Sequence, residues 1–390
     1  MLGLVADDLT GAGDAAVGFA EAGWTAVLAL GPSHLSSSAA TSSSSTVGPT
    51  VLAVSTGCRA APDDEAADRT ARAVEAVLAA GAERLYLKID STVRGSVAAQ
   101  VDGALAAWSV VHPDVRAVIC PAFPGQLRTV VDGHVLVAGG PLAASGAASD
   151  PVTPRTTGDL LEVFPGAVRA AGAQLDGPPG SRLVVDAHGD ADLDQLALGL
   201  DRAGPGIVMV GSGGLAAALG RLWSHPPPPR SAVDVCGRVL VAVSSLHPVT
   251  AAQLEQLRGG PHVSGVDVLT TTTESTTPAA AAAELALRVG TALAGGRYEA
   301  LVVVGGDGAA AILAGLAADS IEIDGAVVPG CPTGFVSGGR ADGLRVVTKS
   351  GGFGGPAAVE QIIHALRADR AAPRTDHPHA GPRPIPKEAP

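Results

Sequence analysis

Short apolar runs rich in valine, isoleucine and leucine alternate along the chain with amphipathic stretches rich in alanine and leucine. Each apolar run ends in a polar, glycine-rich loop, which opens into the next amphipathic stretch. The clearest of these units start at Leu2, Arg84, Arg182, Gly206, Arg238 and Ala300. Apolar strands that alternate with helices are typical of parallel sheets covered on both faces. The pattern therefore predicts an α/β fold with mainly parallel sheets flanked by helices, and ligands beyond the carboxyl ends of the strands.

A proline-rich segment, residues 226–237, divides the chain of 390 residues into two parts. Four consecutive prolines open it, and neither a helix nor a central strand accommodates such a run. We therefore predict two domains, over residues 1–225 and 238–367, with a ligand cleft between them. Residues 368–390 are rich in proline, histidine and arginine and are predicted to form a disordered tail.

The charge balance narrows the class of partner. Lys and Arg number 26 against 38 Asp and Glu, a net charge of −12, and aromatic residues make up 3%. Such a chain gains little from phosphate-backbone electrostatics or base stacking, so we expect no nucleic acid partner. The four cysteines are widely spaced, and neither an export signal nor a uniformly apolar span is present. We expect a cytoplasmic protein without membrane contact. A homodimer is possible, but no motif predicts it.

The first candidate site follows the first apolar run, in the sequence ADDLTGAGD. Asp7 and Asp8 are adjacent there, and Asp14 closes the motif. Carboxylates at the end of a buried strand are costly unless they meet a cation, a sugar hydroxyl or a helix N-terminus. A helix that starts near Thr10 explains one of these acids. Three acids with glycines beside them indicate a ligand.

The second candidate site is the sequence KIDSTVRG, which also follows an apolar run. Only three of the 26 basic residues are lysines, and Lys88 is one of them. Its ammonium, the planar fork of Arg94 and the acceptor Asp90 together suit a small polyhydroxy acid. The alternative is an internal network of these three residues that stabilises the corner between strand and helix.

A third loop contains PAFP, residues 121–124, whose two prolines restrict its conformation. Such a loop could direct Arg128 and His134 into the same site. A lone histidine is, however, more often a structural residue than a ligand-binding one.

In the second domain, two glycine-rich loops follow strands, at Gly305–Gly308 and Thr348–Gly355. A strand, a glycine turn and a helix together offer backbone N–H groups and a positive dipole to phosphate. Two such loops in one domain, one with a rare lysine, predict a nucleotide site. Residues 348–350, TKS, resemble the end of a P-loop, but Thr348 stands where that motif requires glycine, so we reject the P-loop. Residues 211–216, GSGGLA, match the dinucleotide pattern, but the helix after them runs into the prolines, so the fingerprint lacks its context.

Taken in order, these motifs resemble those of the four-carbon acid sugar kinases, the tetronate kinases that act on erythronate, threonate or 3-oxo-tetronate. The resemblance runs from Met1 to about Leu366 and rests on ADDLTGAGD, KIDSTVRG, PAFP, DPVTP, GSGGLA, SSLHPVTAAQL, GGDGAA and KSGGFG. It implies an acid-sugar-binding first domain and a nucleotide-binding second domain. It also implies transfer of the γ-phosphate of ATP, bound with Mg²⁺, to a hydroxyl of a small-molecule sugar acid.

The resemblance also implies roles for individual residues. Asp8 or Asp90 would take the proton of the acceptor hydroxyl, and Arg94 with Lys88 would hold the substrate carboxylate. The substrate-binding residues would be Asp7, Lys88, Ser91, Arg94 and His134. The nucleotide-binding residues would be Ser245, Gly305, Gly306, Asp307, Gly308 and Gly351. No metal ligand is assigned.

Four positions in the nucleotide loops depart from the family pattern. Ser244 replaces a glycine and His247 a serine. Gly308 replaces a threonine and Gly352 an asparagine. The backbone cradle survives these changes, so we expect a kinase. Two alternatives stay open: a non-catalytic acid-sugar-binding protein with a degraded nucleotide site, and an NAD-linked oxidoreductase. The sequence does not decide which tetronate isomer or which hydroxyl is used.

Overall fold

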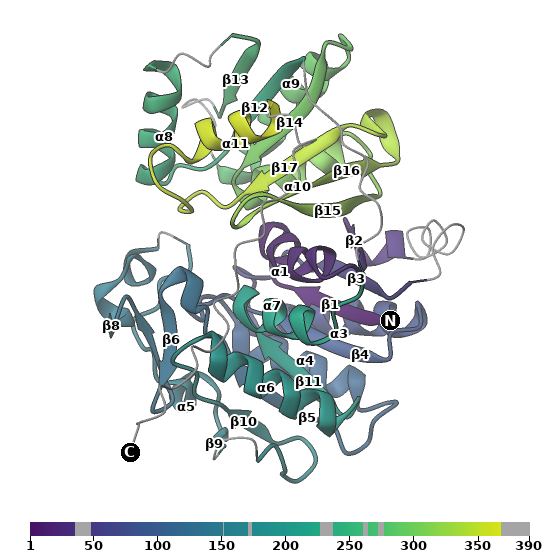
Figure 1. Ribbon diagram of the computed structural model, residues 1–390, viewed down its shortest axis with the longest axis vertical. Helices are drawn as coiled ribbons and strands as arrows, with labels where there is room; N and C mark the ends of the chain where they lie inside the picture. The colour runs from purple at the N-terminus through teal and green to yellow at the C-terminus, as the bar shows by residue number, and fades with distance from the viewer. Residues whose placement is uncertain are drawn as a thin grey trace, which may run out of the picture.

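The computed structural model describes residues 1–35, 48–150, 152–170, 174–226, 237–259, 264–271 and 277–367. Within these ranges the chain forms two lobes, one from its N-terminal part and one from its C-terminal part (Figure 1). The predicted linker, residues 226–237, lies almost wholly outside the described ranges, and so does the predicted tail, residues 368–390.

A sheet of 14 strands runs through both lobes. From one edge to the other its strands are β13 (Val266–Thr270), β12 (Arg238–Val243), β14 (Tyr298–Val304), β17 (Arg345–Lys349), β16 (Cys331–Ser337), β15 (Ser320–Val328), β2 (Thr25–Ala29), β3 (Thr50–Ser55), β1 (Leu2–Ala6), β4 (Arg84–Lys88), β11 (Ile207–Gly211), β5 (Arg116–Cys120), β10 (Arg182–Val184) and β9 (Val168–Arg169). A small antiparallel sheet holds β6 (Arg128–Val131), β7 (His134–Val137) and β8 (Gly140–Pro141). In the large sheet, among the described strands, the antiparallel pairs are β17 with β16, β16 with β15 and β15 with β2, and the other pairs are parallel.

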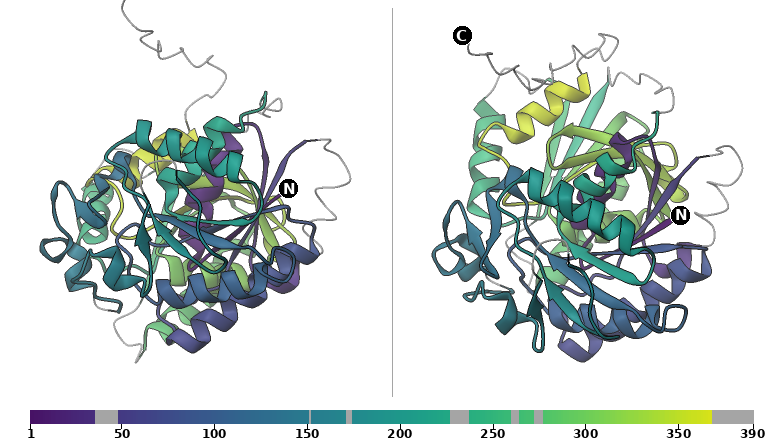
Figure 2. Two further views of the ribbon diagram at one scale, coloured as in Figure 1. Left: turned by 90° about the horizontal axis from the view of Figure 1, so that it is seen from below. Right: turned by 60° about the horizontal axis from the view of Figure 1, so that its bottom comes forward.

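The helices are α1 (Leu9–Glu21), α3 (Asp63–Ala79), α4 (Val97–Trp108), α5 (Leu160–Val163), α6 (Asp190–Ala203), α7 (Gly213–Leu222), α8 (Pro248–Gly259), α9 (Pro278–Leu293), α10 (Gly306–Gly315) and α11 (Ala358–Arg367). In the N-terminal lobe, α3 and α4 pack together on one face of the sheet, and α1, α6 and α7 pack on the other (Figure 2). In the C-terminal lobe α9 packs with α10, and α8 with α11. The expected α/β class is confirmed. None of the helices in the described ranges is both long enough and apolar enough to cross a membrane.

The central strands form where the apolar runs predict them. All five residues of β1 are buried, and so is nearly all of β14. Burial of consecutive residues, rather than alternate ones, follows from the helices on both faces of the sheet.

Strands β2 and β15 join the two lobes. Residues 26–29 of β2 pair antiparallel with residues 320–323 of β15, and Leu30 N donates to Asp319 O at 3.1 Å beside them. Apolar patterning predicts separate sheets for the two domains, but an open edge strand leaves its backbone N–H and C=O groups unpaired. Each lobe here covers such an edge of the other, so the two sheets are continuous.

The twist of this sheet brings the functional ends of the two lobes together. Helix α1 follows β1 and α10 follows β14, and their first turns meet: a Cβ added to Gly306 would lie 3.5 Å from Thr10 Oγ1. Six steps across the sheet separate β1 from β14. Three of the pairings between β14 and β1 are antiparallel, so in a flat sheet these two strands would run in opposite directions. A twist of about 20–25° at each step sums to roughly 120–150°, which turns the two strands most of the way back toward the same direction. The loops after β1 and β14 therefore face one another.

Candidate active site

Loops after three neighbouring strands, β3, β1 and β4, hold a group of charged side chains that we call the charged cluster. Its members are Arg59 after β3, Asp7 and Asp8 after β1, and Asp90 and Arg94 after β4. The carboxyl ends of parallel strands lie at the same edge of a sheet, so residues far apart in sequence meet there.

Arg59 lies at the centre of the charged cluster. Its Nε donates to Asp7 Oδ2 at 2.7 Å and its Nη2 to Asp7 Oδ1 at 2.8 Å. Nη2 also pairs with Asp8 and lies 4.0 Å from Asp90 Oδ1. One planar guanidinium thus offsets the charge of three carboxylates from two neighbouring loops.

Arg94 makes a second bidentate pair. Its Nε donates to Asp90 Oδ2 at 3.0 Å and its Nη2 to Asp90 Oδ1 at 2.7 Å. The remaining nitrogen, Nη1, donates at 2.6 Å to Asp150 of the DPVTP segment. Every nitrogen of this guanidinium has a carboxylate partner. The internal network that the sequence left as an alternative is therefore present for Asp90 and Arg94.

Burial and the arginines act in opposite directions on the pKa values of these acids. Burial removes hydration and would raise the pKa of Asp8, but Arg59 and Lys88 outweigh it and lower that pKa. Burial likewise opposes ionisation of Asp90, yet Arg59 and Arg94 hold its pKa well below the usual range. For Asp7, burial is the larger effect and raises the pKa. Asp8 and Asp90 are therefore firmly ionised at neutral pH and are poor proton acceptors.

Lys88, at the end of β4, is 5% exposed. Its Nζ donates to Ile89 O at 3.0 Å. A Cβ added to Gly11 would lie 3.1 Å from Nζ, so the ammonium reaches the first turn of α1. An ammonium carries three donors, and within the described residues this one has a single partner. Lys88 thus keeps donors for a ligand, and Ser91 is half-buried in the loop that follows it.

Two residues with positive φ shape the KIDSTVRG loop. Val93 has a φ of 51°, which is strained for a β-branched residue. Gly95 has a φ of 78°, and a Cβ there would overlap the backbone carbonyl oxygen of Arg59. Glycine at position 95 therefore allows the loop that carries Arg59 to approach Asp90.

Arg128 and His134 lie on the small sheet, and the structure separates them. His134 is 54% exposed and lies 3.9 Å from Asp159; no contact in the described part of the chain links it to the charged cluster, so its predicted role stays a prediction. Arg128 is closer: its pKa is lowered by burial and also responds to Asp90 and Arg94. Its Nε is buried without a hydrogen-bond partner in the described ranges, so it keeps a donor for an anion.

On the nucleotide side, the loop after β14 forms a glycine turn and the start of α10, as the sequence predicts. Gly305 precedes the helix with a φ of 115° and makes no side-chain cap. The first-turn N–H groups, those of Gly306, Asp307 and Gly308, therefore lack a side-chain partner there. A ten-residue helix with such an N-terminus attracts phosphate.

Lys349, the last residue of β17, is fully buried. Its Nζ donates to Ser350 O at 2.9 Å, and burial lowers its pKa to about 8. Thr250 Oγ1 donates to Gly351 O at 2.8 Å and lies 3.1 Å from Ser245 Oγ. A Cβ on Gly351 would overlap Ser245 Oγ. The predicted residues Ser245 and Gly351 are thus in contact.

The four departures from the family pattern form two contacting pairs. A Cβ on Gly308 would overlap the side chain of Ser244. A Cβ on Gly352 would lie 3.2 Å from His247 Nε2. In each pair, the larger residue occupies the space beside a position that has become glycine. The changes therefore exchange side chains between neighbouring loops and leave the backbone turn in place.

These loops fit a nucleoside triphosphate, because they combine free helix N–H groups with a buried lysine. For Mg²⁺, the described residues include no group of three or more His, Cys, Asp and Glu side chains that could hold a metal ion. Mg²⁺ is commonly held by phosphate oxygens, waters and one or two carboxylates. The donor set present therefore fits a metal held mainly by the nucleotide.

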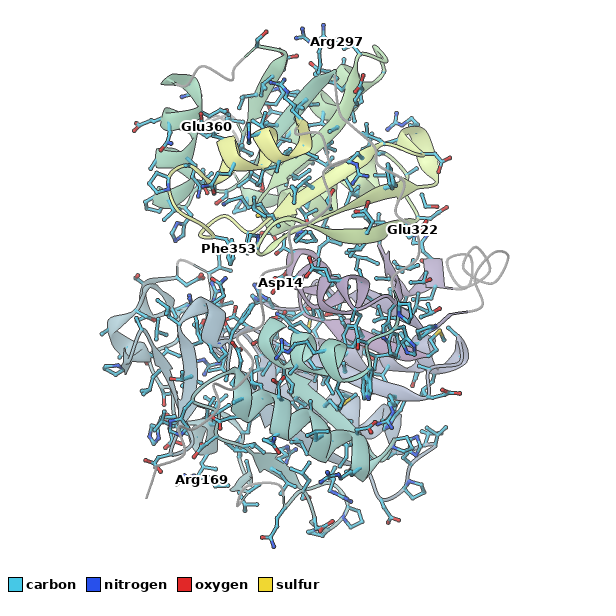
Figure 3. The ribbon with its side chains drawn as sticks, viewed as in Figure 1. Asp14, Arg169, Arg297, Glu322, Phe353 and Glu360 are labelled. Atoms are coloured by element: carbon cyan, nitrogen blue, oxygen red, sulfur yellow. The ribbon has the colours of Figure 1, made fainter. Side chains whose placement is uncertain are left out.

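Helix α1 lies between the charged cluster and the nucleotide loops. A Cβ on Gly13 would lie 3.0 Å from Pro332 and 3.7 Å from Thr348 of the C-terminal lobe. Figure 3 shows Asp14 at the boundary of the N-terminal lobe and Phe353 on the C-terminal side of that boundary. The two groups of predicted residues thus lie on opposite sides of one junction, whereas the expected ligand cleft there stays a prediction.

The dinucleotide-like sequence GSGGLA has a packing role. A Cβ on Gly214 would lie 2.6 Å from Ala122 O, and one on Gly213 would lie 2.8 Å from the Phe123 ring. Glycine at these positions lets α7 pack closely against the PAFP loop. This use of the glycines leaves the NAD-linked alternative without support.

Sequence reasoning missed Arg59. It lies in the segment TGCR after β3, among residues that match no motif considered above. The one usable signal was topological: an arginine shortly after a buried strand, in a fold whose neighbouring strands end in acids.

Comparison with known proteins matches two parts of the chain to family models. Residues 2–176 match the family described as sugar-binding N-terminal domain, and residues 276–359 match the nucleotide-binding C-terminal domain. A D-threonate kinase of Bordetella bronchiseptica is 36% identical over 95% of this chain and 98% of its own. A D-erythronate kinase of Heliobacterium modesticaldum is 27% identical, over 77% and 83%. A 3-oxo-tetronate kinase of Pseudomonas fluorescens is 26% identical, over 95% and 98%.

Solved structures show the same fold. A Haemophilus influenzae protein, 20% identical, matches with a TM-score of 0.68 over 94% of this chain and 99% of its own. A Bordetella bronchiseptica protein, a domain-swapped dimer with bound citrate, is 34% identical and matches with a TM-score of 0.51 over 94% and 98%. Fold and site define a two-domain α/β protein with a sugar-binding and a nucleotide-binding part. The chain belongs to the four-carbon acid sugar kinase family.

Replacing Gly95 with alanine is expected to destabilise the fold, because the new Cβ would overlap the Arg59 carbonyl. We expect the free energy of unfolding, measured by urea titration, to fall by about 1–3 kcal/mol. Gly139→Ala is the matched control: Gly139 has a φ of 77°, and no atom lies within 4 Å of its added Cβ. Equal losses in both variants would contradict the packing role of Gly95.

Arg59→Met is expected to cost about 3–5 kcal/mol near neutral pH, because three buried carboxylates lose their shared partner. The pKa of Asp8 and of Asp90 is lowered in the folded protein, so their ion pairs stabilise the wild type above the usual carboxyl pKa and are lost as the pH falls through the lowered values. In the variant, burial would raise the pKa of Asp8, so its protonation would relieve part of the cost, whereas Asp90 would keep its pair with Arg94.

The stability gap between wild type and Arg59→Met should therefore narrow as the pH falls from about 7 to about 4, as measured by urea unfolding at each pH. The exposed Arg72, paired with Asp68 on α3, provides the control Arg72→Met, which should cost no more than about 1 kcal/mol. A gap that stayed constant with pH would count against Arg59 as the common partner of these acids.

The contact between Ser244 and Gly308 predicts non-additive effects. Gly308→Thr alone should destabilise the protein by about 1–3 kcal/mol, because the new side chain overlaps Ser244. Adding Ser244→Gly should recover most of that loss. A double-mutant cycle by urea unfolding measures the coupling, expected above about 0.5 kcal/mol. Additive effects would show that the two positions do not share this space.

Proposed function

We propose that the protein transfers the γ-phosphate of ATP to an alcohol group of a four-carbon sugar acid. The observation that carries this proposal is that the charged cluster and the free N-terminus of α10 both lie beside the first turn of α1. Phosphoryl transfer depends mainly on positioning and charge neutralisation. The N-terminal lobe would position the sugar acid, and the N-terminus of α10 would position the phosphates and neutralise part of their charge.

On the acid side, we assign the substrate carboxylate to Lys88 and Arg128, the cations that keep donors. The family resemblance assigns Arg94 to the substrate carboxylate, but the nitrogens of its guanidinium already donate to Asp90 and Asp150. The charged cluster would then hold these loops in place. Asp7, Asp8, Asp90 and Ser91, which the loops carry, would bind the substrate hydroxyl groups.

On the nucleotide side, the turn Gly305–Gly308 would hold phosphate oxygens through its backbone N–H groups. Ser245 and Gly351 would fix the neighbouring loops through the contact described above. Lys349 would add a cation. ATP supplies the transferred group, and bound Mg²⁺ would neutralise phosphate charge.

We propose D-threonate as the preferred substrate, because the Bordetella bronchiseptica relative that is 36% identical is a D-threonate kinase. We place the reaction in the cytoplasm, where ATP is supplied. A homodimer stays part of the proposal, supported by the domain-swapped dimer of the Bordetella bronchiseptica structure.

The test is an ADP-release assay on the purified full chain with ATP, Mg²⁺ and a panel of sugar acids. The panel holds both enantiomers of erythronate, of threonate and of 3-oxo-tetronate. We expect acid-dependent ADP release, fastest with D-threonate. A different preferred member would change the substrate but keep the reaction.

No ADP release from folded protein with any member would overturn the proposal. Thermal unfolding then separates the alternatives, since a ligand stabilises the fold that binds it. Stabilisation by a sugar acid and not by ATP with Mg²⁺ would indicate a binding protein. Stabilisation by NAD and not by ATP would indicate an oxidoreductase.

A further inference from the structure

Asp14 is an acid at the junction that has no assigned role. It lies on α1 and is half-buried. Within the described part of the chain it makes no hydrogen bond or ion pair. Asp7, Asp8 and Asp90 differ from it in this respect, because arginines hold all three. Asp14 is thus a half-buried carboxylate of the N-terminal lobe whose oxygens remain available at this junction.

Groups from both lobes surround Asp14. The charge of Lys88 lowers the pKa of Asp14, and the charge of Asp8 raises it. Cys331, the first residue of β16, lies close enough in the C-terminal lobe to interact electrostatically with it, as does Tyr86 of β4. Figure 3 places Asp14 on the border of the N-terminal lobe. A group bound between Lys88 and the nucleotide loops would therefore lie beside this carboxylate.

A structural role for Asp14 would lie at α7. That helix begins at Gly213, and a Cβ there would lie 2.5 Å from Asp14 Oδ2. A carboxylate that serves a helix N-terminus is stabilised in its ionised form. The pKa of Asp14 is instead raised, because burial outweighs Lys88 and the charge of Asp8 adds to burial. A raised pKa without a partner is typical of a proton acceptor and costly in a purely structural residue.

We propose that Asp14 is the general base that takes the proton of the acceptor hydroxyl, in place of Asp8 or Asp90. This inference rests on the proposed function. As the hydroxyl oxygen bonds to the γ-phosphorus, Asp14 accepts its proton. The bond from that phosphorus to the bridging oxygen breaks, and its electron pair leaves on ADP. Asp14 then releases the proton to water before the next turnover.

The test compares the full-length wild type with Asp14→Asn, using the panel acid that gives the fastest ADP release. Asparagine keeps the size and one acceptor oxygen but does not take a proton at neutral pH. We expect kcat to fall about 10²–10⁴-fold with KM changed less than about threefold. Asp64→Asn, at an exposed acid on α3, is the control and should keep wild-type kcat.

The pH profile separates a base from a structural residue. The wild-type kcat should fall as the pH drops through the pKa of Asp14, which lies above the usual carboxyl value. Asp14→Asn should lose this limb. In Asp14→Ala, added formate should restore turnover, whereas chloride at the same concentration should not.

Several results would overturn the inference while the proposed function stands. These are an Asp14→Asn variant within threefold of wild-type kcat, a variant that keeps the acid limb, or a wild type with no acid limb above about pH 4. The last result needs no variant, so it decides the matter even if both substitutions prevent folding. Absence of ADP release by the wild type would overturn the proposed function itself.

Discussion

A single guanidinium, that of Arg59, sets the geometry of the sugar-side loops. A buried carboxylate without a partner costs several kcal/mol, and Arg59 lies among Asp7, Asp8 and Asp90, while Arg94 also pairs with Asp90. The planar fork matters here, because Arg59 donates to both oxygens of Asp7 side by side while its Nη2 also pairs with Asp8. Gly95 completes the arrangement by leaving room for the Arg59 backbone. Since these acids and arginines offset one another, the charges left for a ligand come from residues around the charged cluster.

Much of the fold was predictable, because parallel strands covered by helices have a strong signature in the apolar pattern. The continuous sheet was not, since the register of β2 on β15 depends on edges that only the folded lobes present. The motif loops were predictable for the same reason as the strands that precede them. Arg59 was not, because it meets Asp7 across 52 residues and belongs to no recognisable motif. The division of roles between Asp8 and Asp14 also depends on three-dimensional contacts that spacing does not encode.

The nucleotide loops show how sequence departures can mislead when they are read one at a time. Ser244 with Gly308, and His247 with Gly352, are neighbours in space although they lie far apart in the chain. In each pair, a side chain missing at one position is matched by a larger side chain at the position that contacts it. Phosphate binding at a helix N-terminus relies on backbone N–H groups, so a site of this kind tolerates such exchanges as long as the turn itself keeps its shape.

The pairing of β2 with β15 also determines how the two lobes can move. Backbone hydrogen bonds cross the junction, so a hinge there would have to break a ladder that holds both edges. Torsion of the sheet has no such cost. A change of about 3° at each of the six steps between β1 and β14 would rotate one set of loops against the other by roughly 18°. A ligand that drew the lobes together by this change of twist would store elastic energy in the sheet. That energy would assist the separation of the lobes when the ligand leaves.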